Sequence, residues 1–243
     1  MATTTFIHVK NDLVLDTILE FSINHPEIYI VLTIDRKQID YNIPWTTKKF
    51  FTYVKKRNNK IKIQRLNAGA NKEDDGYDSL KEDMKYMDII HIDPWKVFPQ
   101  IETGIHNSIN MIYLCNKTNP ELQYEIGTDE KTRPYLSEEE FDFILREFQG
   151  RVIERVYSKI RYVRIQGKGE KKIRMSNIAK KYGLIPKSEE DDLGEQLEKI
   201  KTDIIGLQEN RMIESTESTR NNIKDKIYEH LVQLLVPLPD IFV

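Results

Sequence analysis

The chain has 243 residues, of which 39% are hydrophobic and 31% charged, which is enough for one large domain with a real core. Its 37 basic and 39 acidic residues give a net charge of -2, which argues against a general attraction to nucleic acid or to an anionic membrane. A single cysteine, Cys115, excludes an intrachain disulfide, and no run of about 20 apolar residues marks a membrane span, so a cytoplasmic protein is expected.

Apolar strands alternate with amphipathic helices through most of the chain. The pattern predicts five strands, over residues 28–34, 61–64, 88–92, 122–126 and 161–165. A helix is predicted before the first strand, over residues 11–24. Between the strands, helices are predicted that begin after the caps Thr46-Thr47, over 77–86, over 102–117, and from the capping box Ser137–Glu140. This alternation is typical of a parallel sheet in an α/β protein.

The character of the sequence changes after residue 187, where strand signals almost disappear. We therefore predict an α/β region over residues 1–187 and a helical C-terminal extension over residues 188–243. Apolar residues in this extension are spaced four, three, four and three positions apart, at Leu193, Leu197, Ile200, Ile204 and Leu207. Ile223, Ile227, Leu231 and Leu234 mark a second helix. These helices either pack on the sheet and on each other or form a coiled coil that joins subunits into a homo- or hetero-oligomer.

Each predicted strand ends on a polar or charged group. Arg36 and Arg65 follow the first two strands, and Gln166 follows the last one, where Gly167-Lys168-Gly169 forms a turn that could offer donors to a phosphate. His91 and Asp93 alternate with apolar residues and point to one face of the third strand, and Glu125 lies on the next strand. Because parallel strands place their carboxyl ends at one edge, these groups are expected to converge on a pocket.

Several segments, in this order and spacing, resemble a family of sugar-phosphate aldolase-like TIM barrels, relatives of the tagatose-bisphosphate aldolase non-catalytic-type subunit. The segments are Asp35 to Asn42, Trp45-Thr46-Thr47, Asp74-Asp75-Gly76, Ile89 to Lys96 (IIHIDPWK) and Tyr124 to Glu130 (YEIGTDE). The resemblance covers about residues 28–185 and implies a partial or complete TIM-barrel-like sheet. It also implies a phosphorylated sugar as ligand, with Arg36, Gln38, Tyr41, Arg65, Gln166 and Lys168 as substrate-binding residues.

The departures from the family pattern bear on catalysis. Where the family carries an Asp-His pair after the second strand, this chain has Leu66 and Asn67, and a later family histidine is replaced within residues 187–192. An aspartate and a histidine at those places would move a proton and bind a divalent metal, which leucine cannot do and asparagine does poorly. These losses indicate a degenerate barrel, a pseudoenzyme that serves as a structural or regulatory subunit and retains sugar-phosphate binding.

Two other functions stay open at this point. In an active metal-assisted lyase or isomerase, His91 or Glu125 would be catalytic, Asp93 with His91 would hold the metal, and the arginines would hold the anionic groups. In a nucleic-acid enzyme, Asp93 and Glu125 would bind metal, but the next lysine after Glu125 is Lys131, beyond a loop, so this function ranks last. The sequence does not decide whether the chain is an enzyme.

Overall fold

The computed structural model describes residues 4–9, 11–34, 46–68, 77–127, 136–188, 197 and 217–236. Two compact units make up the chain, residues 1–62 with 192–243, and residues 63–191. The division at residue 187 that the sequence suggests stays a prediction. Among the described residues, no helix combines the length and the apolar composition that crossing a bilayer requires.

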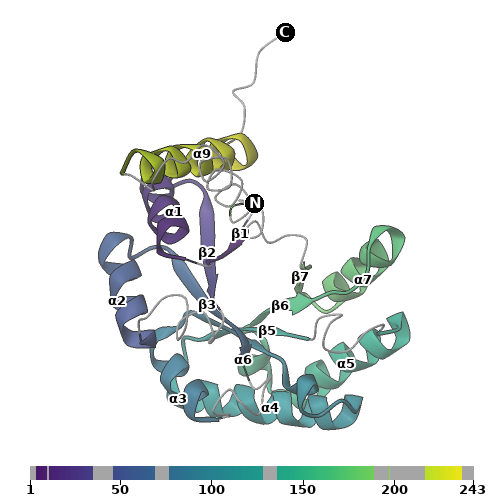
Figure 1. Ribbon diagram of the computed structural model, residues 1–243. Helices are drawn as coiled ribbons and strands as arrows, with labels where there is room; N and C mark the ends of the chain where they lie inside the picture. The colour runs from purple at the N-terminus through teal and green to yellow at the C-terminus, as the bar shows by residue number, and fades with distance from the viewer. Residues whose placement is uncertain are drawn as a thin grey trace. The chain divides into compact units, whose positions relative to one another are not determined.

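Among its described residues, the first unit has the parallel strands β1 (Thr4–His8) and β2 (Tyr29–Ile34) and the helices α1 (Asp12–Asn24), α2 (Thr47–Arg57) and α9 (Glu217–Leu235). The caps follow from the sequence, since the side chains of Asn11 and Thr46 accept hydrogen bonds from the backbone N–H groups of Val14 and Lys49. Figure 1 shows α9 next to α1, and these two helices, far apart in the sequence, contact each other within this unit.

The contact between α1 and α9 is apolar at its centre and charged at its edges. Ile223, Ile227 and Leu231 of α9 are buried, as their helical spacing predicts. Lys224 lies 3.0 Å from Glu20 of α1. The predicted second C-terminal helix is therefore present. Of the five apolar residues predicted to form the first C-terminal helix, Leu197 is described and is buried. The other four, Leu193, Ile200, Ile204 and Leu207, lie outside the described residues.

The second unit is built on five strands that follow one another in the sheet in chain order, each parallel to its neighbour: β3 (Lys62–Ala68), β4 (Ile89–Ile92), β5 (Gln123–Ile126), β6 (Ile160–Arg164) and β7 (Ile185–Lys187). Their registers place His91 opposite Glu125 and Arg164 opposite Lys187. All carboxyl ends therefore lie at one edge of this sheet.

The connections of the second unit are α3 (Tyr77–Tyr86), the 3₁₀ turn η2 (Pro94–Lys96), α4 (Ile101–Thr118), α5 (Glu138–Arg151), α6 (Glu154–Tyr157) and α7 (Gly169–Lys181). In Figure 1 the long helices α3, α4, α5 and α7 line the outer face of β3–β7. The predicted capping box at Ser137 and Glu140 is formed at the start of α5. Cys115 of α4 is buried, and burial raises the pKa of its thiol to about 12, as expected for an inert core residue.

All five predicted strands are present, and with them the predicted α/β, TIM-barrel-like class of fold. Strands β1 and β7 and the helix α7 were not predicted. Strand β7 has only three residues and contains Pro186, and proline within a short apolar run argues against a strand except at a sheet edge or bulge. The sequence of α7 is strongly basic and follows the Gly167-Lys168-Gly169 turn, so its sparse apolar positions gave a weak helical signal.

Candidate functional site

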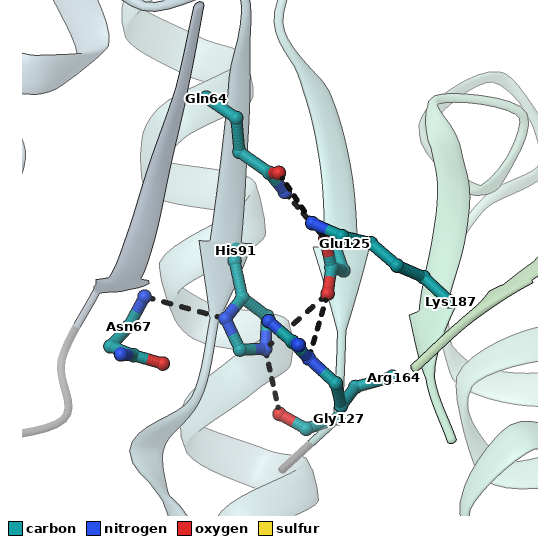
Figure 2. Close-up of polar contacts among 7 residues, drawn as sticks. All are labelled: Gln64, Asn67, His91, Glu125, Gly127, Arg164 and Lys187. Carbon is teal, nitrogen blue, oxygen red and sulfur yellow. Dashed lines mark hydrogen bonds and ion pairs between the residues drawn. The ribbon is translucent and has the colours of Figure 1, made fainter. Parts of the chain in front are cut away.

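Six polar residues of the second unit gather near the carboxyl ends of its strands. This polar cluster consists of Gln64, Asn67, His91, Glu125, Arg164 and Lys187, one or two residues from each of β3 to β7. Successive side chains of a strand point to opposite faces, and Tyr124 and Ile126 flank Glu125. The cluster therefore occupies the face of the sheet away from α3, α4, α5 and α7. Figure 2 shows its other side chains gathered around Glu125, while Asn67 meets His91 through its backbone N–H.

Glu125 is fully buried and is contacted by three of its neighbours. Its Oε1 atom lies 3.1 Å from Nε of Arg164, and its Oε2 atom lies 3.1 Å from Nζ of Lys187. The side-chain amide of Gln64 donates to Oε2 at 2.5 Å. Burial alone would raise the pKa of Glu125, but the charges of Lys187 and Arg164 outweigh it and hold that pKa well below the usual carboxyl range. Glu125 is therefore ionised.

His91 uses both of its ring nitrogens within the protein. Nε2 lies 3.2 Å from the carbonyl oxygen of Gly127, which can only accept, so Nε2 carries the proton. Nδ1 accepts a hydrogen bond of 3.3 Å from the backbone N–H of Asn67, so Nδ1 is unprotonated. The imidazole is thus the neutral Nε2–H tautomer. Burial lowers the pKa of His91 to about 4, and Arg164 and Lys187 act in the same direction against the opposing effect of Glu125.

Two unusual backbone conformations hold this histidine. Gly127 has a φ of 114°, and a Cβ atom at this position would lie 3.1 Å from the Cβ and the carbonyl oxygen of Arg164. Only glycine combines that φ with such a close approach to the next strand. Asn67 has a φ of 56°, the left-handed region that asparagine tolerates better than most residues. Gly127 and Asn67 therefore both contact His91 through their backbone atoms.

Lys187 connects the last strand to the rest of the cluster. Its Nζ atom donates to Oε1 of Gln64 at 2.9 Å and to Oε2 of Glu125 at 3.1 Å, and its side chain is 3% exposed. The cluster thus contains two cationic side chains, one carboxylate and a neutral imidazole. These six residues therefore carry a net positive charge, which favours an anionic ligand beside them.

Two of the predicted substrate-binding residues are turned toward other parts of the fold. Arg65 lies between Gln64 and Leu66 on β3, so its side chain points to the other face, where Nε lies 2.8 Å from Oδ2 of the buried Asp83 in α3. The side chain of Gln166 is buried, and its Oε1 accepts from the backbone N–H of Leu136 at 2.9 Å. Neither contact belongs to the polar cluster.

The other residues predicted to bind substrate or metal or to act in catalysis lie in different places. Lys168 is exposed and is the N-cap residue of α7. Asp93 is buried directly after β4, where its backbone N–H donates to the carbonyl oxygen of Ala68. Arg36, Gln38 and Tyr41 lie outside the described residues. The catalytic roles predicted for His91 and Glu125 stay predictions, although the structure does place these two side chains together, with Nε2 and Oε1 4.0 Å apart.

The aldolase resemblance implies a divalent metal, and the described residues do not fit one. They contain no group of three or more His, Cys, Asp or Glu side chains placed to hold an ion. His91 offers no free nitrogen, and Glu125 is already held by two cations. Metal binding by His91 and Asp93 stays a prediction without a matching set of ligands in this part of the chain.

Sequence reasoning missed three members of the cluster, Gln64, Arg164 and Lys187. Gln64 and Arg164 lie within predicted strands, so alternation from Glu125 and His91 could have found them once neighbouring strands were aligned. Lys187 carried no signal, because its strand was not recognised. In the sequence, Lys187 stands out only as the first residue of the segment 187–192, which departs from the aldolase-like pattern.

No protein-family model matches the sequence, and no curated protein matches it either. Solved structures do match by fold. A proposed fructose-1,6-biphosphate aldolase from Coccidioides immitis is 11% identical and aligns over 95% of this chain and 88% of its own, with a TM-score of 0.63. The YdjI aldolase from Escherichia coli K12 is 10% identical over 97% of this chain and 91% of its own, with a TM-score of 0.59.

A deoxyribose phosphate aldolase from Aeropyrum pernix is 12% identical over 76% of this chain and 74% of its own, with a TM-score of 0.52. At such identities the likeness is one of fold alone. The chain therefore has a TIM-barrel-like fold of the kind that these aldolases share, and the predicted scaffold is confirmed at that level.

Proposed function

We propose that this chain is a sugar-phosphate-binding barrel of the aldolase type that has no metal-dependent aldolase activity of its own. The observation that carries the proposal is the internal pairing of the polar cluster. Glu125 is contacted by Lys187, Arg164 and Gln64, and both nitrogens of His91 are engaged. The side chains that would have to transfer protons are thus already engaged by other residues of the protein.

Proton transfer needs a group whose pKa lies near the working pH and whose reacting atom can reach the substrate. The pKa of Glu125 is held far below neutral, so this carboxylate is a weak base. The pKa of His91 is lowered to about 4, and its ring would have to break a hydrogen bond before it could accept or donate a proton. Both features favour a positioning role for these side chains.

Anion binding, in contrast, suits the charges of the cluster. Arg164 and Lys187 outnumber the single carboxylate, and Arg164 is the more exposed cation, at 8%. Its ion pair with Glu125 engages Nε, while a guanidinium carries five N–H donors in a planar fork that matches phosphate. We infer that a phosphate group approaches the cluster from the Arg164 side, in keeping with aldolase-like neighbours of the fold.

The test is a thermal-shift titration with fructose 1,6-bisphosphate, with and without Zn²⁺, together with an assay for aldol cleavage. Fructose without phosphate is the control ligand. We expect stabilisation by the bisphosphate but not by fructose, without dependence on Zn²⁺, and no cleavage. Metal-dependent cleavage would show an active aldolase, and the absence of any shift would remove the ligand class. A chain that binds without cleaving would serve as a structural or regulatory subunit.

A further inference from the structure

A second candidate site lies at the opposite end of the strands in the second unit. A hollow of about 590 Å³ is lined by Tyr113, Asn116, Lys117, Pro120, Arg155 and Lys159, and we refer to it as the basic groove. Small-molecule sites typically measure about 300–1,000 Å³, so the basic groove has a suitable size. Neither the sequence motifs nor the polar cluster involves any of these residues.

The lining residues come from three segments that meet at the amino ends of β5 and β6. Lys117 belongs to the last turn of α4, and Pro120 follows it in the connection to β5. Arg155 lies in α6, and Lys159 directly precedes β6. Because the polar cluster lies at the carboxyl ends of the same strands, the two sites are separated by the length of these strands.

Among the residues that the structure describes, the charged side chains lining the basic groove are all cations, namely Lys117, Arg155 and Lys159. Within the described part of the chain, no ion pair or side-chain hydrogen bond occupies Lys117, Arg155 or Lys159. Because three cations line one hollow, an anion bound there would make charge-assisted contacts with them.

Exposed lysines are often only solvated, but the basic groove also has an aromatic side chain in its wall. The hydroxyl of Tyr113 accepts a hydrogen bond of 3.1 Å from the backbone N–H of Ile153, which fixes the aromatic ring between α4 and α6. Lys159 is half-buried, and Pro120 adds a rigid apolar surface. A fixed aromatic ring beside converging cations matches a ligand that has both a flat ring and phosphate groups.

We propose that the basic groove binds a nucleoside diphosphate or triphosphate, with the phosphates on Lys117, Arg155 and Lys159 and the base against Tyr113 and Pro120. The proposal is independent of sugar-phosphate binding at the polar cluster. A nucleotide at one end of the strands and a sugar phosphate at the other would give this barrel two separate ligands.

The test is calorimetric titration of the full chain with ADP, inorganic pyrophosphate and adenosine in buffer without Mg²⁺. We expect ADP to bind more tightly than pyrophosphate, and adenosine to bind most weakly. The variant Lys117→Gln/Arg155→Gln should weaken ADP binding at least about tenfold, since charge-assisted contacts are lost. Tyr113→Leu should weaken ADP binding and leave pyrophosphate binding nearly unchanged.

The matched control is Lys56→Gln/Lys180→Gln, which removes the same charge from two exposed helical positions outside the basic groove. Equal losses in the two double variants would mean non-specific attraction and would overturn the proposal, as would failure of the unaltered chain to bind ADP. Tighter binding of single-stranded RNA than of ADP would indicate a polyanion surface instead. The stabilisation by fructose 1,6-bisphosphate should survive in Lys117→Gln/Arg155→Gln, which keeps the two proposals distinguishable.

Discussion

Glu125 and His91 are buried side by side, yet one side chain is charged and the other is neutral. A buried carboxylate loses its hydration, and the nearby charges of Lys187 and Arg164, with the hydrogen bond from Gln64, compensate for that loss. For the imidazole, Glu125 at 4.0 Å compensates only in part, because burial and the charges of Arg164 and Lys187 all disfavour a protonated ring. The result is an ionised glutamate beside a neutral histidine.

Replacing the carboxylate should destabilise the protein more than any exposed substitution would. The variant Glu125→Gln leaves Lys187 and Arg164 buried without their shared anion, and breaking a buried pair in this way costs about 3–5 kcal/mol. Urea denaturation at neutral pH measures the loss. Glu121→Gln, which removes an exposed carboxylate just before β5, is the control and should change stability little. A loss for Glu125→Gln as small as that of the control would refute the role given to the ion pairs.

Stability should also depend on pH through His91. The pKa of His91 is lowered from 6.5 to about 4 in the folded chain, so the unfolded chain takes up the proton first. The stability present above pH 6.5 is therefore lost as the pH falls toward 4, by roughly 3 kcal/mol. Denaturation midpoints between pH 7 and 4 should show this slope, reduced in His91→Gln and kept in His106→Gln, an exposed histidine of α4. Because the pKa of Glu125 is also lowered, its own contribution disappears only below the ordinary carboxyl pKa.

At the scale of elements, helix ends and close contacts fix how each helix meets the sheet. The capping box at Ser137 satisfies two backbone donors at the start of α5, and α5 runs through Gly150 to Arg151 without a break. Gly104 of α4 has a different role, because the ring of the buried Trp95 rests directly on it. The glycine allows η2 and α4 to pack together after β4.

Two glycine-to-alanine changes should therefore shift the stability of the protein in opposite directions. A Cβ atom at Gly104 would fall 2.1 Å from Nε1 of Trp95, so Gly104→Ala should destabilise the protein by about 1–3 kcal/mol. A Cβ atom at Gly150 meets nothing within 4 Å, so Gly150→Ala should stabilise it by about 0.5–1 kcal/mol through higher helix propensity. Thermal denaturation followed by circular dichroism compares the two, and equal effects would contradict the close packing of Trp95.

On the scale of the whole molecule, the last described helix completes a unit that begins at the first strand. Residues about two hundred positions apart meet there, as in the hydrogen bond of 3.0 Å from the side-chain amide of Asn24 to the hydroxyl of Tyr228. Such long-range closure costs loop entropy, which the apolar contact between α1 and α9 must offset. The C-terminal helix is thus part of the folded core of this unit, while a role in joining subunits stays a prediction.

The buried centre of α9 should matter more than its exposed end. Ile227 is fully buried, so Ile227→Ala should destabilise the protein by about 2–5 kcal/mol. Leu234, further along the same helix, is 48% exposed, so Leu234→Ala should cost less than about 1 kcal/mol. Urea denaturation of both variants provides the comparison. If Leu234→Ala were the more damaging change, the exposed end of α9 would have to be covered by something else.

The sequence by itself determined the alternation of strands and helices, because a period of two or of 3.6 in apolar residues is a local property. It also placed His91 and Glu125 together, since parallel strands share one carboxyl edge. Strand β7 was one of the exceptions, together with β1 and α7, because its three residues include a proline and carry too little local signal.

Only the tertiary structure decided which polar side chains pair. Arg65 and Gln64 are adjacent in sequence, yet strand alternation sends one to Asp83 and the other to Glu125. Lys187 reaches the same carboxylate from a strand more than sixty residues away. Register between neighbouring strands settles such partners, and register depends on contacts between segments that are distant in the chain, so no local pattern records it.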